Sequence, residues 1–427
     1  MKKNNLQPRD FITTPQMQLL IEEAESLKSN PGFKVSDVID HKGHQYVDLV
    51  QEGGGVLGIA LLGYTFIMEK AGLRFFNLGG TSAGAINTML LAGCGKVEEE
   101  KSTRILEELC NKNLFDFVDG DGRIGALIKA VVNKEGNLLW RVIRIIRTIW
   151  RTLRDKLGLN PGDAFTVWLS EILGKYDIRQ LSHLEERLSD IPDLNIRGKG
   201  KATYKKALFT IIAADVTTKT KVNFPLMAPL YWKEPLQTNP SVFVRASMSI
   251  PFFFEPLLVK NIPEAGKENS GLWWQKARYS GMVPSEVSFV DGGMLSNFPI
   301  NVFHSQDQVP QKPTFGARLS SYREAPSDTA SLLGYMGAMI STMRQVYDLD
   351  FLLRNADYKK LICRIDADEK FNWLDFDMKD EEKIELFYLG AKKGLGFLKT
   401  FDWEAYKQLR RDMLDKPGAS RRRSAAR

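Results

Sequence analysis

Residues 46–91 decide the fold, and they read YVDLVQEGGGVLGIALLGYTFIMEKAGLRFFNLGGTSAGAINTMLL. Two short strand-like runs alternate here with two apolar helical runs, and glycines stand at the junctions. The predicted elements are, in order, strand Tyr46–Val50, helix Val56–Lys70, strand Arg74–Leu78 and helix Ala83–Leu91. Alternation of strand, glycine loop and helix predicts a parallel sheet covered by helices, which is an α/β fold.

The rest of the chain continues this pattern with longer connections. The other predicted strands are Ala207–Asp215, Val287–Val290, Pro313–Leu319 and Lys360–Ile365, and the other predicted helices are Pro15–Lys28, Phe298–His304, Ser331–Leu353, Glu381–Thr400 and Trp403–Leu414. We expect a polar, helical segment at 1–44 and a functional core at 45–310 that carries a helical insertion at about 115–160. Residues 311–415 should complete the fold, and 416–427 should be a disordered basic tail.

Composition excludes several classes of protein. The chain has 427 residues, of which 43% are hydrophobic and 26% charged, as in ordinary globular proteins. The first residues contain no apolar run, so no Sec signal peptide is expected, and the longest mainly apolar stretch, Val56–Met68, is too short for a transmembrane helix. The three cysteines form no CxxC pair, which fits a reducing compartment. We therefore expect a cytoplasmic protein.

The net charge of +7 is concentrated in two segments. Residues 138–158 hold six basic residues and one acidic residue, and residues 416–427 hold five basic residues and no acid, so the remainder is slightly acidic. A nucleic-acid-binding protein would be expected to combine a basic face with a reading motif. We find no such motif in the sequence and expect no nucleic-acid partner.

Gly80-Thr81-Ser82-Ala83-Gly84 is a GxSxG sequence between a predicted strand and a predicted helix. That setting is typical of a nucleophile elbow, in which a serine sits on a sharp turn and needs small neighbours. The beginning of the following helix would favour negative charge near Ser82. The simpler alternative is a glycine turn in which Ser82 only caps the helix.

Gly53, Gly54 and Gly55 form a second glycine-rich turn between a strand and a helix. Their amide groups can face one concavity, which suits an oxyanion or a phosphate. No Gly-Lys-[Ser/Thr] follows, so this is not a Walker A loop. A dinucleotide site would require an acidic residue after the next strand, and none stands at 75–80.

Asp291 ends a predicted strand and is followed by Gly292 and Gly293, a sequence that is also common in simple turns. The carboxyl ends of strands line the active crevice of α/β sheets, so Asp291 can lie near Ser82. Only one of the four histidines, His304, follows Asp291 in the order of an α/β-hydrolase triad, and it falls in a predicted helix. A two-residue Ser–Asp arrangement is therefore favoured over a histidine triad.

Four sequence boxes in this order resemble the patatin-like phospholipases: Glu52–Gly55, Gly80–Gly84, Ala246–Pro251 and Asp291–Gly293. The resemblance implies a three-layer sandwich with a mainly parallel central sheet and helices on both faces. It also implies that Ser82 is the nucleophile, Asp291 the base, and the amides of Gly53, Gly54 and Gly55 the oxyanion hole. Members hydrolyse acyl esters of lipids without a metal or another cofactor, so we expect none. One departure is Leu57, which stands where the family usually has Arg or Lys, a residue thought to support the loop or the lipid head group.

Membrane phospholipids are the expected partner, and three segments could contact them. In 138–158 the arginines recur every three or four residues and share one helical face, opposite an apolar face, as in helices that lie in the head-group layer. The candidate contacts in 138–158 are Arg141, Arg144, Arg147, Trp150 and Arg151. Leu272-Trp273-Trp274 is the second segment, with Trp273 and Trp274 as candidates and a partly buried loop as the alternative. The arginines at 421–423 are the third, with an inert solvated tail as the alternative. The alternative for 138–158 is a helix packed on the core, a partner-binding helix or a cover over the site.

The sequence therefore predicts a serine carboxylic-ester hydrolase of phospholipase A or lysophospholipase type, peripherally associated with membranes. Two alternatives remain open: a neutral-lipid esterase or acyltransferase on the same Ser82–Asp291 pair, and a non-enzymatic phosphate- or nucleotide-binding module built on Gly53–Gly55. A small-molecule or protein activator is compatible with either enzyme. No clustered metal ligands are seen, although the acidic loop Asp116–Asp121 could hold a structural cation.

Overall fold

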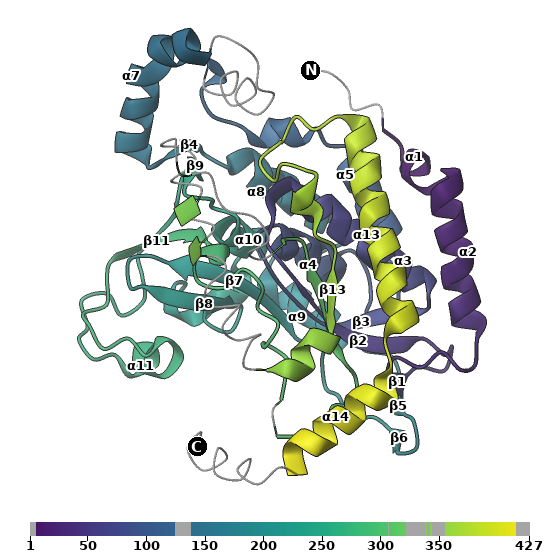
Figure 1. Cartoon of the computed structure of the whole chain (residues 1–427). Helices are drawn as coiled ribbons and strands as arrows, with labels where there is room; N and C mark the ends of the chain where they lie inside the picture. Colours follow the sequence, from purple (N-terminus) through teal and green to yellow (C-terminus); the bar gives the residue numbers. More distant parts are fainter. Residues whose placement is uncertain are drawn as a thin grey trace.

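The computed structural model of the chain describes residues 6–123, 138–305, 307–321 and 355–415, together with positions 329, 338, 339, 342 and 343. Its centre is a mixed sheet in which five neighbouring strands run parallel (Figure 1). In sheet order these are β13 (Ile362–Arg364), β12 (Thr314–Arg318), β2 (Gln45–Gln51), β3 (Leu73–Thr81) and β7 (Phe209–Asp215). The predicted α/β fold is therefore confirmed.

Antiparallel strands add to this sheet at β7 and at β2. Strands β8 (Thr220–Phe224) and β11 (Glu286–Asp291) both pair with β7, and β10 (Leu257–Lys260) pairs with β11. Strand β1 (Val38–Ile39) pairs with the first residue of β2 and is followed in sheet order by β5 (Asn195–Ile196) and β6 (Gly200–Lys201). A separate pair of short parallel strands, β4 (Gly158–Asn160) and β9 (Phe252–Phe254), lies outside the main sheet. Because β12 pairs directly with β2, the C-terminal part of the chain and the core share one sheet.

Helices and a connecting segment cover the two faces of the sheet and make three layers. The ring of Phe315 in β12 meets Phe397 of helix α13 (Asp380–Thr400), with centroids 4.9 Å apart. The next residue, Gly316, points to the opposite face, where a Cβ atom would lie 2.7 Å from Ile300. Alternate residues of one strand face opposite sides, so α13 and the segment around Ile300 cover different faces.

Helix α3 (Gly58–Lys70) packs against α13 with unusually close backbones. A Cβ atom on Gly63 would overlap the carbonyl group of Phe387, and one on Gly390 would overlap the carbonyl group of Ala60. Glycine on both helices is what allows this approach. The remaining helices are α1 (Pro8–Ile12), α2 (Pro15–Ser29), α4 (Ala83–Gly93), α5 (Ser102–Cys110), α7 (Leu138–Lys156), α8 (Asp163–Lys175), α9 (Leu181–Ser189), α10 (Ser241–Ser247), α11 (Gly271–Ala277) and α14 (Trp403–Asp415).

Most predicted elements agree with the structure to within two residues at each end, but the predicted helix Phe298–His304 is wrong. This segment is irregular, because Pro299 cannot donate a helical hydrogen bond and the flanking Phe298 and Ile300 are both buried against the sheet. The predicted helix Ser331–Leu353 falls mostly, and the basic tail 416–427 entirely, outside the described residues. Among the helices that are described, none is both long and apolar enough to cross a bilayer.

Candidate active site

Ser82 occupies a strained turn between β3 and α4. Its backbone has φ 52° and ψ −117°, a conformation that a residue with a side chain adopts at a cost of about 1–3 kcal/mol. The glycines around it are required, because a Cβ atom on Gly80 would overlap the carbonyl of Gly84 and one on Gly84 would overlap the carbonyl of Gln51. The side chain of Ser82 makes no capping hydrogen bond to α4, so the alternative of a simple helix cap is wrong.

Strand β7 brings Asp291 to Ser82. Thr81, the last residue of β3, pairs with Ile212, and Asp291, the last residue of β11, pairs with Ala213. Strand β8 pairs with β7 from Ile211 to Asp215 and occupies one of its two edges. Strands β3 and β11 therefore both pair with the opposite edge, where they meet end to end. The two ends are thus about one residue step, ~3.3 Å, apart along β7.

The meeting of Ser82 and Asp291 has a different geometric cause from the predicted one. The prediction relied on strands that run in one direction and end at the same edge of the sheet. Strand β11 instead runs antiparallel to β7 and arrives from the opposite end. Gly292 allows the close approach, because a Cβ atom there would overlap the carbonyl oxygen of Ile212.

Ser247, the last residue of helix α10, and Ser249, two residues later, hydrogen-bond to the backbones of Ser82 and Asp291. The amide N–H of Ser82 donates a 2.8 Å hydrogen bond to Oγ of Ser247, and the amide N–H of Asp291 donates a 2.8 Å bond to the carbonyl oxygen of Ser249. The carboxylate of Asp291 also accepts a 2.7 Å bond from the amide of Gly293. Ser82 and Asp291 are each only 2% exposed. The role of Ser247 was not predicted, although it belongs to the Ala246–Pro251 box.

The three glycines at 53–55 lie beside Ser82 but do not all point to it. A Cβ atom on Gly53 would lie 3.0 Å from Cβ of Ser82. The amide of Gly53, however, donates a 3.1 Å hydrogen bond to the carbonyl oxygen of Asn297, so its predicted place in an oxyanion hole is wrong for this arrangement. The amides of Gly54 and Gly55 make no hydrogen bond to any part of the chain that the structure describes.

Glu52 holds this glycine turn in place, a role that the sequence did not reveal. Its fully buried carboxylate accepts hydrogen bonds from the amides of Leu319 (2.6 Å) and Ser320 (2.8 Å) and from Nδ2 of Asn297 (3.2 Å). Nδ2 of Asn297 also donates to the carbonyl oxygen of Gly53 at 3.1 Å. One signal was visible: an acidic residue directly precedes a glycine run inside an apolar stretch, where an unpaired charge would be costly.

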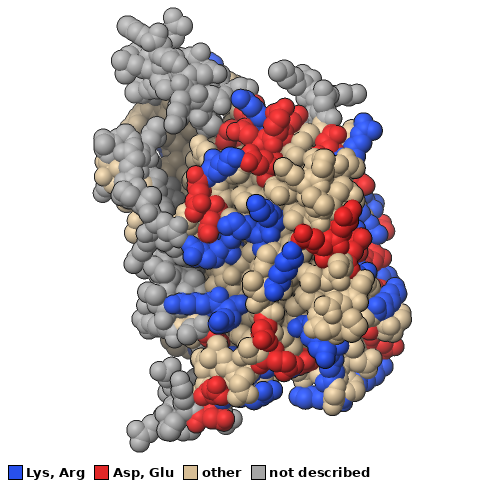
Figure 2. All heavy atoms as spheres, turned by 45° about the vertical axis from the view of Figure 1, so that its right-hand side comes forward, with Lys and Arg blue, Asp and Glu red and all other residues tan. Residues whose placement is uncertain are grey.

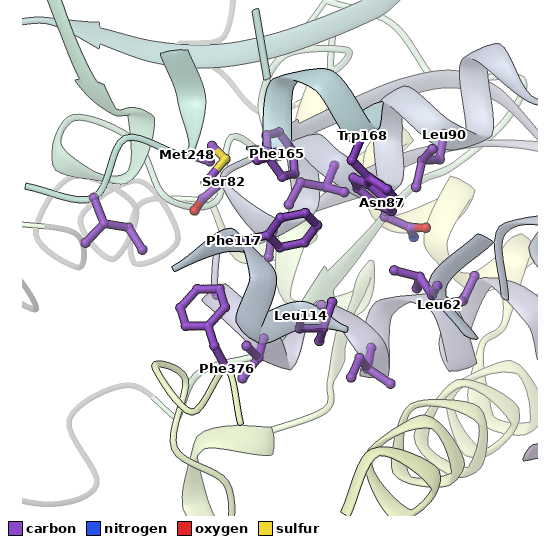
Figure 3. A pocket seen from close by; sticks show the side chains of 18 of the residues that line it. Leu62, Ser82, Asn87, Leu90, Leu114, Phe117, Phe165, Trp168, Met248 and Phe376 are labelled. Atoms are coloured by element: carbon purple, nitrogen blue, oxygen red, sulfur yellow. The ribbon is translucent and has the colours of Figure 1, made fainter. Parts of the chain in front are cut away.

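An apolar cavity of about 90 Å³ opens beside Ser82. Figure 3 shows Ser82 and Met248 at one end and Leu62, Asn87 and Leu90 at the other. Aromatic side chains make up much of the wall, namely Phe117, Phe165, Trp168, Phe254 and Phe376. A serine at the end of an apolar cavity suits a substrate whose reacting group carries a hydrocarbon chain.

None of the four histidines, all of which lie in the described part of the chain, lines this cavity. His304 is packed 4.2 Å from the ring of Tyr358 and lies 3.4 Å from the carboxylate of Asp357. Burial and the charge of Arg410 lower the pKa of His304 to about 4. Among the described residues there is also no cluster of three or more side chains suited to a metal ion.

The predicted membrane contacts have different outcomes. Trp273 is fully buried between Tyr231 and Tyr279, at ring distances of 5.5 and 5.7 Å, so its prediction as a lipid contact is wrong. The apolar partners of this indole lie within the fold and were not evident from its local sequence. Trp274, in contrast, is 51% exposed on α11.

Of the candidates on α7, Trp150 is 69% exposed, and Arg147 and Arg151 are exposed as well. Arg141 and Arg144 lie outside the described side chains. Figure 1 places α11 far from α7, so Trp274 belongs to a different surface.

Comparison with known proteins identifies the family. The model of the family "Patatin-like phospholipase" matches residues 49–304, which hold the glycine turn, Ser82 and Asp291. The chain belongs to the patatin-like phospholipases. This is a family of lipid acyl hydrolases, and the three-layer α/β sandwich described above is its fold.

Two individual proteins are similar to this patatin-like chain. "Uncharacterized protein YqhO" of Bacillus subtilis (strain 168) is 28% identical over 360 residues, which span 84% of this chain and all of YqhO. VipD from Legionella pneumophila has a solved structure that matches 86% of this chain and 70% of its own, with 14% identity and a TM-score of 0.36.

Leu57, where the family usually has a basic residue, is 1% exposed. Its amide donates a 3.1 Å bond to the carbonyl of Gly54. The side chain of Leu57 is therefore part of the core and not available to a lipid head group.

Proposed function

We propose that this protein is a phospholipase of A or lysophospholipase type that cleaves fatty-acyl esters of membrane phospholipids with a Ser82–Asp291 dyad. The observation that carries the proposal is the end-to-end meeting of β3 and β11 on β7, with the strained Ser82 directly after one strand and the buried Asp291 at the end of the other. The apolar cavity beginning at Ser82 supports an acyl group as substrate.

In the proposed reaction, Oγ of Ser82 attacks the ester carbonyl carbon and its proton passes to the carboxylate of Asp291. The negative charge on the carbonyl oxygen is held by the amides of Gly54 and Gly55, and the N-terminus of α4 adds favourable potential. The proton on Asp291 then goes to the departing lyso-lipid oxygen. Water hydrolyses the acyl-enzyme by the same steps in reverse, which releases the fatty acid.

The cavity supports a proposed orientation for the acyl chain and the head group. The acyl chain would enter toward Leu62 and Leu90, and the head group would stay outside the opposite end, at Ser82 and Met248, which we call the mouth. A cavity of about 90 Å³ is smaller than the ~150 Å³ apolar cavity that accommodates benzene, so it would hold only the chain segment next to the ester in this conformation. With Leu57 buried, head-group selection would rest on residues at the mouth.

Active-site labelling with a fluorophosphonate and measurement of fatty-acid release from phospholipid and triacylglycerol substrates test the proposal. Wild type should be labelled and should release fatty acid from phospholipid. Ser82→Ala should lose both, and Asp291→Asn should lose at least about 100-fold in rate, because the base is removed while the shape is kept.

Each other outcome has a defined meaning. Preference for triacylglycerol, or transfer of the acyl group to an added alcohol, would favour the esterase or acyltransferase alternative. Labelling without release would point to a missing activator. Absence of labelling in folded wild type would overturn the dyad and favour a phosphate-binding turn at Gly53–Gly55, for which nucleotide-dependent thermal stabilisation is the measurement.

A further inference from the structure

Two large apolar residues next to the cavity are held in strained conformations and face solvent. Leu157 has φ 61° and is 59% exposed, and Phe252 has φ 67° and is 48% exposed. Gly158 pairs with Phe252 in the β4–β9 ladder, so Leu157 and Phe252 are neighbours. Bulky residues rarely adopt positive φ, and apolar side chains gain nothing from exposure to water. The fold alone does not explain why both positions carry large apolar residues.

Strand β9 connects this exposed pair to the cavity at Ser82. Phe252 begins the strand at the surface, and Phe254, two residues later, lines the cavity. Between them, the ring of Phe253 stacks on Phe376, another cavity residue, with centroids 5.2 Å apart and planes at 15°. Three consecutive phenylalanines of β9 therefore connect the exposed position 252 to the cavity residue Phe254.

The end of helix α7 adds aromatic and basic groups to the same surface. Trp150, in the last two turns of α7, is 69% exposed, and Leu157 directly follows the helix, which ends at Lys156. Residues 147–156 hold four basic side chains and one acidic side chain. The four basic residues are exposed: Arg147, Arg151, Arg154 and Lys156. Lys156 also forms a 3.1 Å ion pair with Glu255, which joins α7 to the segment after β9.

The charge on this surface differs from that on another face of the molecule. Figure 2 turns the right-hand side of Figure 1, which carries α2 and α13, toward the viewer, and there groups of basic and of acidic side chains are interspersed. In Figure 1, α7 extends away from the body beyond β4 and β9, on the other side of the view from α2. A projecting basic and aromatic helix can reach a flat surface that the body itself would not touch.

We propose that the end of α7 (residues 147–156) together with Leu157 and Phe252 docks the protein on an anionic phospholipid bilayer, with the cavity mouth toward the lipid. We name this set the docking surface. The arginines and Lys156 would lie among anionic head groups, while Trp150, Leu157 and Phe252 enter the interfacial layer. The inference rests on the proposed function, because only an enzyme that takes acyl chains from a bilayer needs its cavity mouth there.

Binding can be tested without turnover by using Ser82→Ala protein and flotation with two kinds of vesicle. One contains phosphatidylcholine alone, and the other contains phosphatidylcholine with about 30% phosphatidylglycerol, whose anionic head groups attract basic segments. Ser82→Ala should bind the anionic vesicles at least about tenfold more tightly. Adding Leu157→Asn and Phe252→Asn should weaken that binding at least about tenfold, since Asn tolerates positive φ but cannot enter the interface.

The matched control is Leu19→Gln, which removes a 60% exposed leucine from α2 and should leave vesicle binding unchanged. In an otherwise wild-type chain, Leu157→Asn with Phe252→Asn should hydrolyse a water-soluble short-chain ester within twofold of wild type and should not lower Tm. Arg147→Gln with Arg151→Gln should remove the preference for anionic vesicles.

Three results would overturn the docking surface. These are unchanged vesicle binding by the double Asn variant, equal binding of Ser82→Ala to both vesicle types, and no binding of Ser82→Ala to either. The last result would make a protein partner the better occupant of this surface. Hydrolysis of the soluble ester by wild type tests the dyad separately, so failure of the docking surface and failure of the proposed function are distinguishable.

Discussion

Ser247→Ala removes one atom that holds the strained backbone of Ser82. Oγ of Ser247 accepts the 2.8 Å hydrogen bond from the amide of Ser82, and Ser247 is fully buried, so water cannot replace it. Leaving a buried amide without a partner costs about 1–3 kcal/mol. The φ of 52° at Ser82 stores strain of similar size. Without the hydrogen bond, the backbone of Ser82 can therefore move toward an unstrained conformation.

If this cost falls on the catalytic conformation, kcat should drop by about 5- to 150-fold, because 1.36 kcal/mol corresponds to a factor of ten. The same loss should lower the free energy of unfolding by no more than about 3 kcal/mol. KM for a short-chain ester should change less than twofold, since Ser247 does not line the cavity. Steady-state kinetics and urea unfolding provide both quantities.

Ser249→Ala is the control for this experiment. It removes a hydroxyl two residues away that bonds Arg245, while the carbonyl of Ser249 keeps its bond to the amide of Asp291. Ser249→Ala should lower the free energy of unfolding, but it should reduce kcat less than Ser247→Ala does. Wild-type turnover by Ser247→Ala, or equal loss in both variants, would refute the view that the Ser82 amide bond maintains the catalytic conformation.

Three further changes test other parts of the site. Gly292→Ala should abolish turnover and lower Tm, because its Cβ would push β11 away from Ile212; Gly271→Ala, which meets nothing within 4 Å, is the control. Leu90→Ala, at the far end of the cavity, should shift kcat/KM toward longer acyl chains by about tenfold and destabilise the fold by about 2–5 kcal/mol, as measured with a series of ester chain lengths. His304→Gln should retain turnover. The pKa of His304 is lowered to about 4 in the folded protein, whereas in the unfolded chain the imidazole takes up its proton near pH 6.5. The free energy of unfolding of wild type should therefore fall by up to about 3 kcal/mol between pH 6.5 and pH 4. Urea titrations at several pH values should show that His304→Gln lacks this fall.

The local parts of the site were predictable from the sequence because their causes are local. A serine among small residues between a strand and a helix predicts a sharp turn, and the structure has that turn at Ser82. The order of strand, glycine turn and helix likewise predicted the parallel part of the sheet. In each case a short run of residues determines the geometry through steric limits on the backbone.

The parts that failed depend on distant partners. The amide of Gly53 is satisfied by Asn297, and Trp273 is buried by Tyr231, but neither partner is evident from the sequence around the residue it contacts. A glycine run indicates only that backbone amides are accessible, and a tryptophan indicates only that burial of a large apolar side chain is favourable. Which atoms meet them is decided by tertiary packing.

The edge of β7 shows why the Ser82–Asp291 meeting needs the whole fold. Its two strand ends come from β3 and β11, which run in opposite directions, so no rule about carboxyl ends predicts that they stop opposite Ile212 and Ala213. A one-residue slip of β11 would turn Asp291 to the other face of the sheet. The bond from the Asp291 amide to Ser249, together with the space left by Gly292, opposes such a slip. The proposed chemistry therefore depends on strand register as much as on the two reacting side chains.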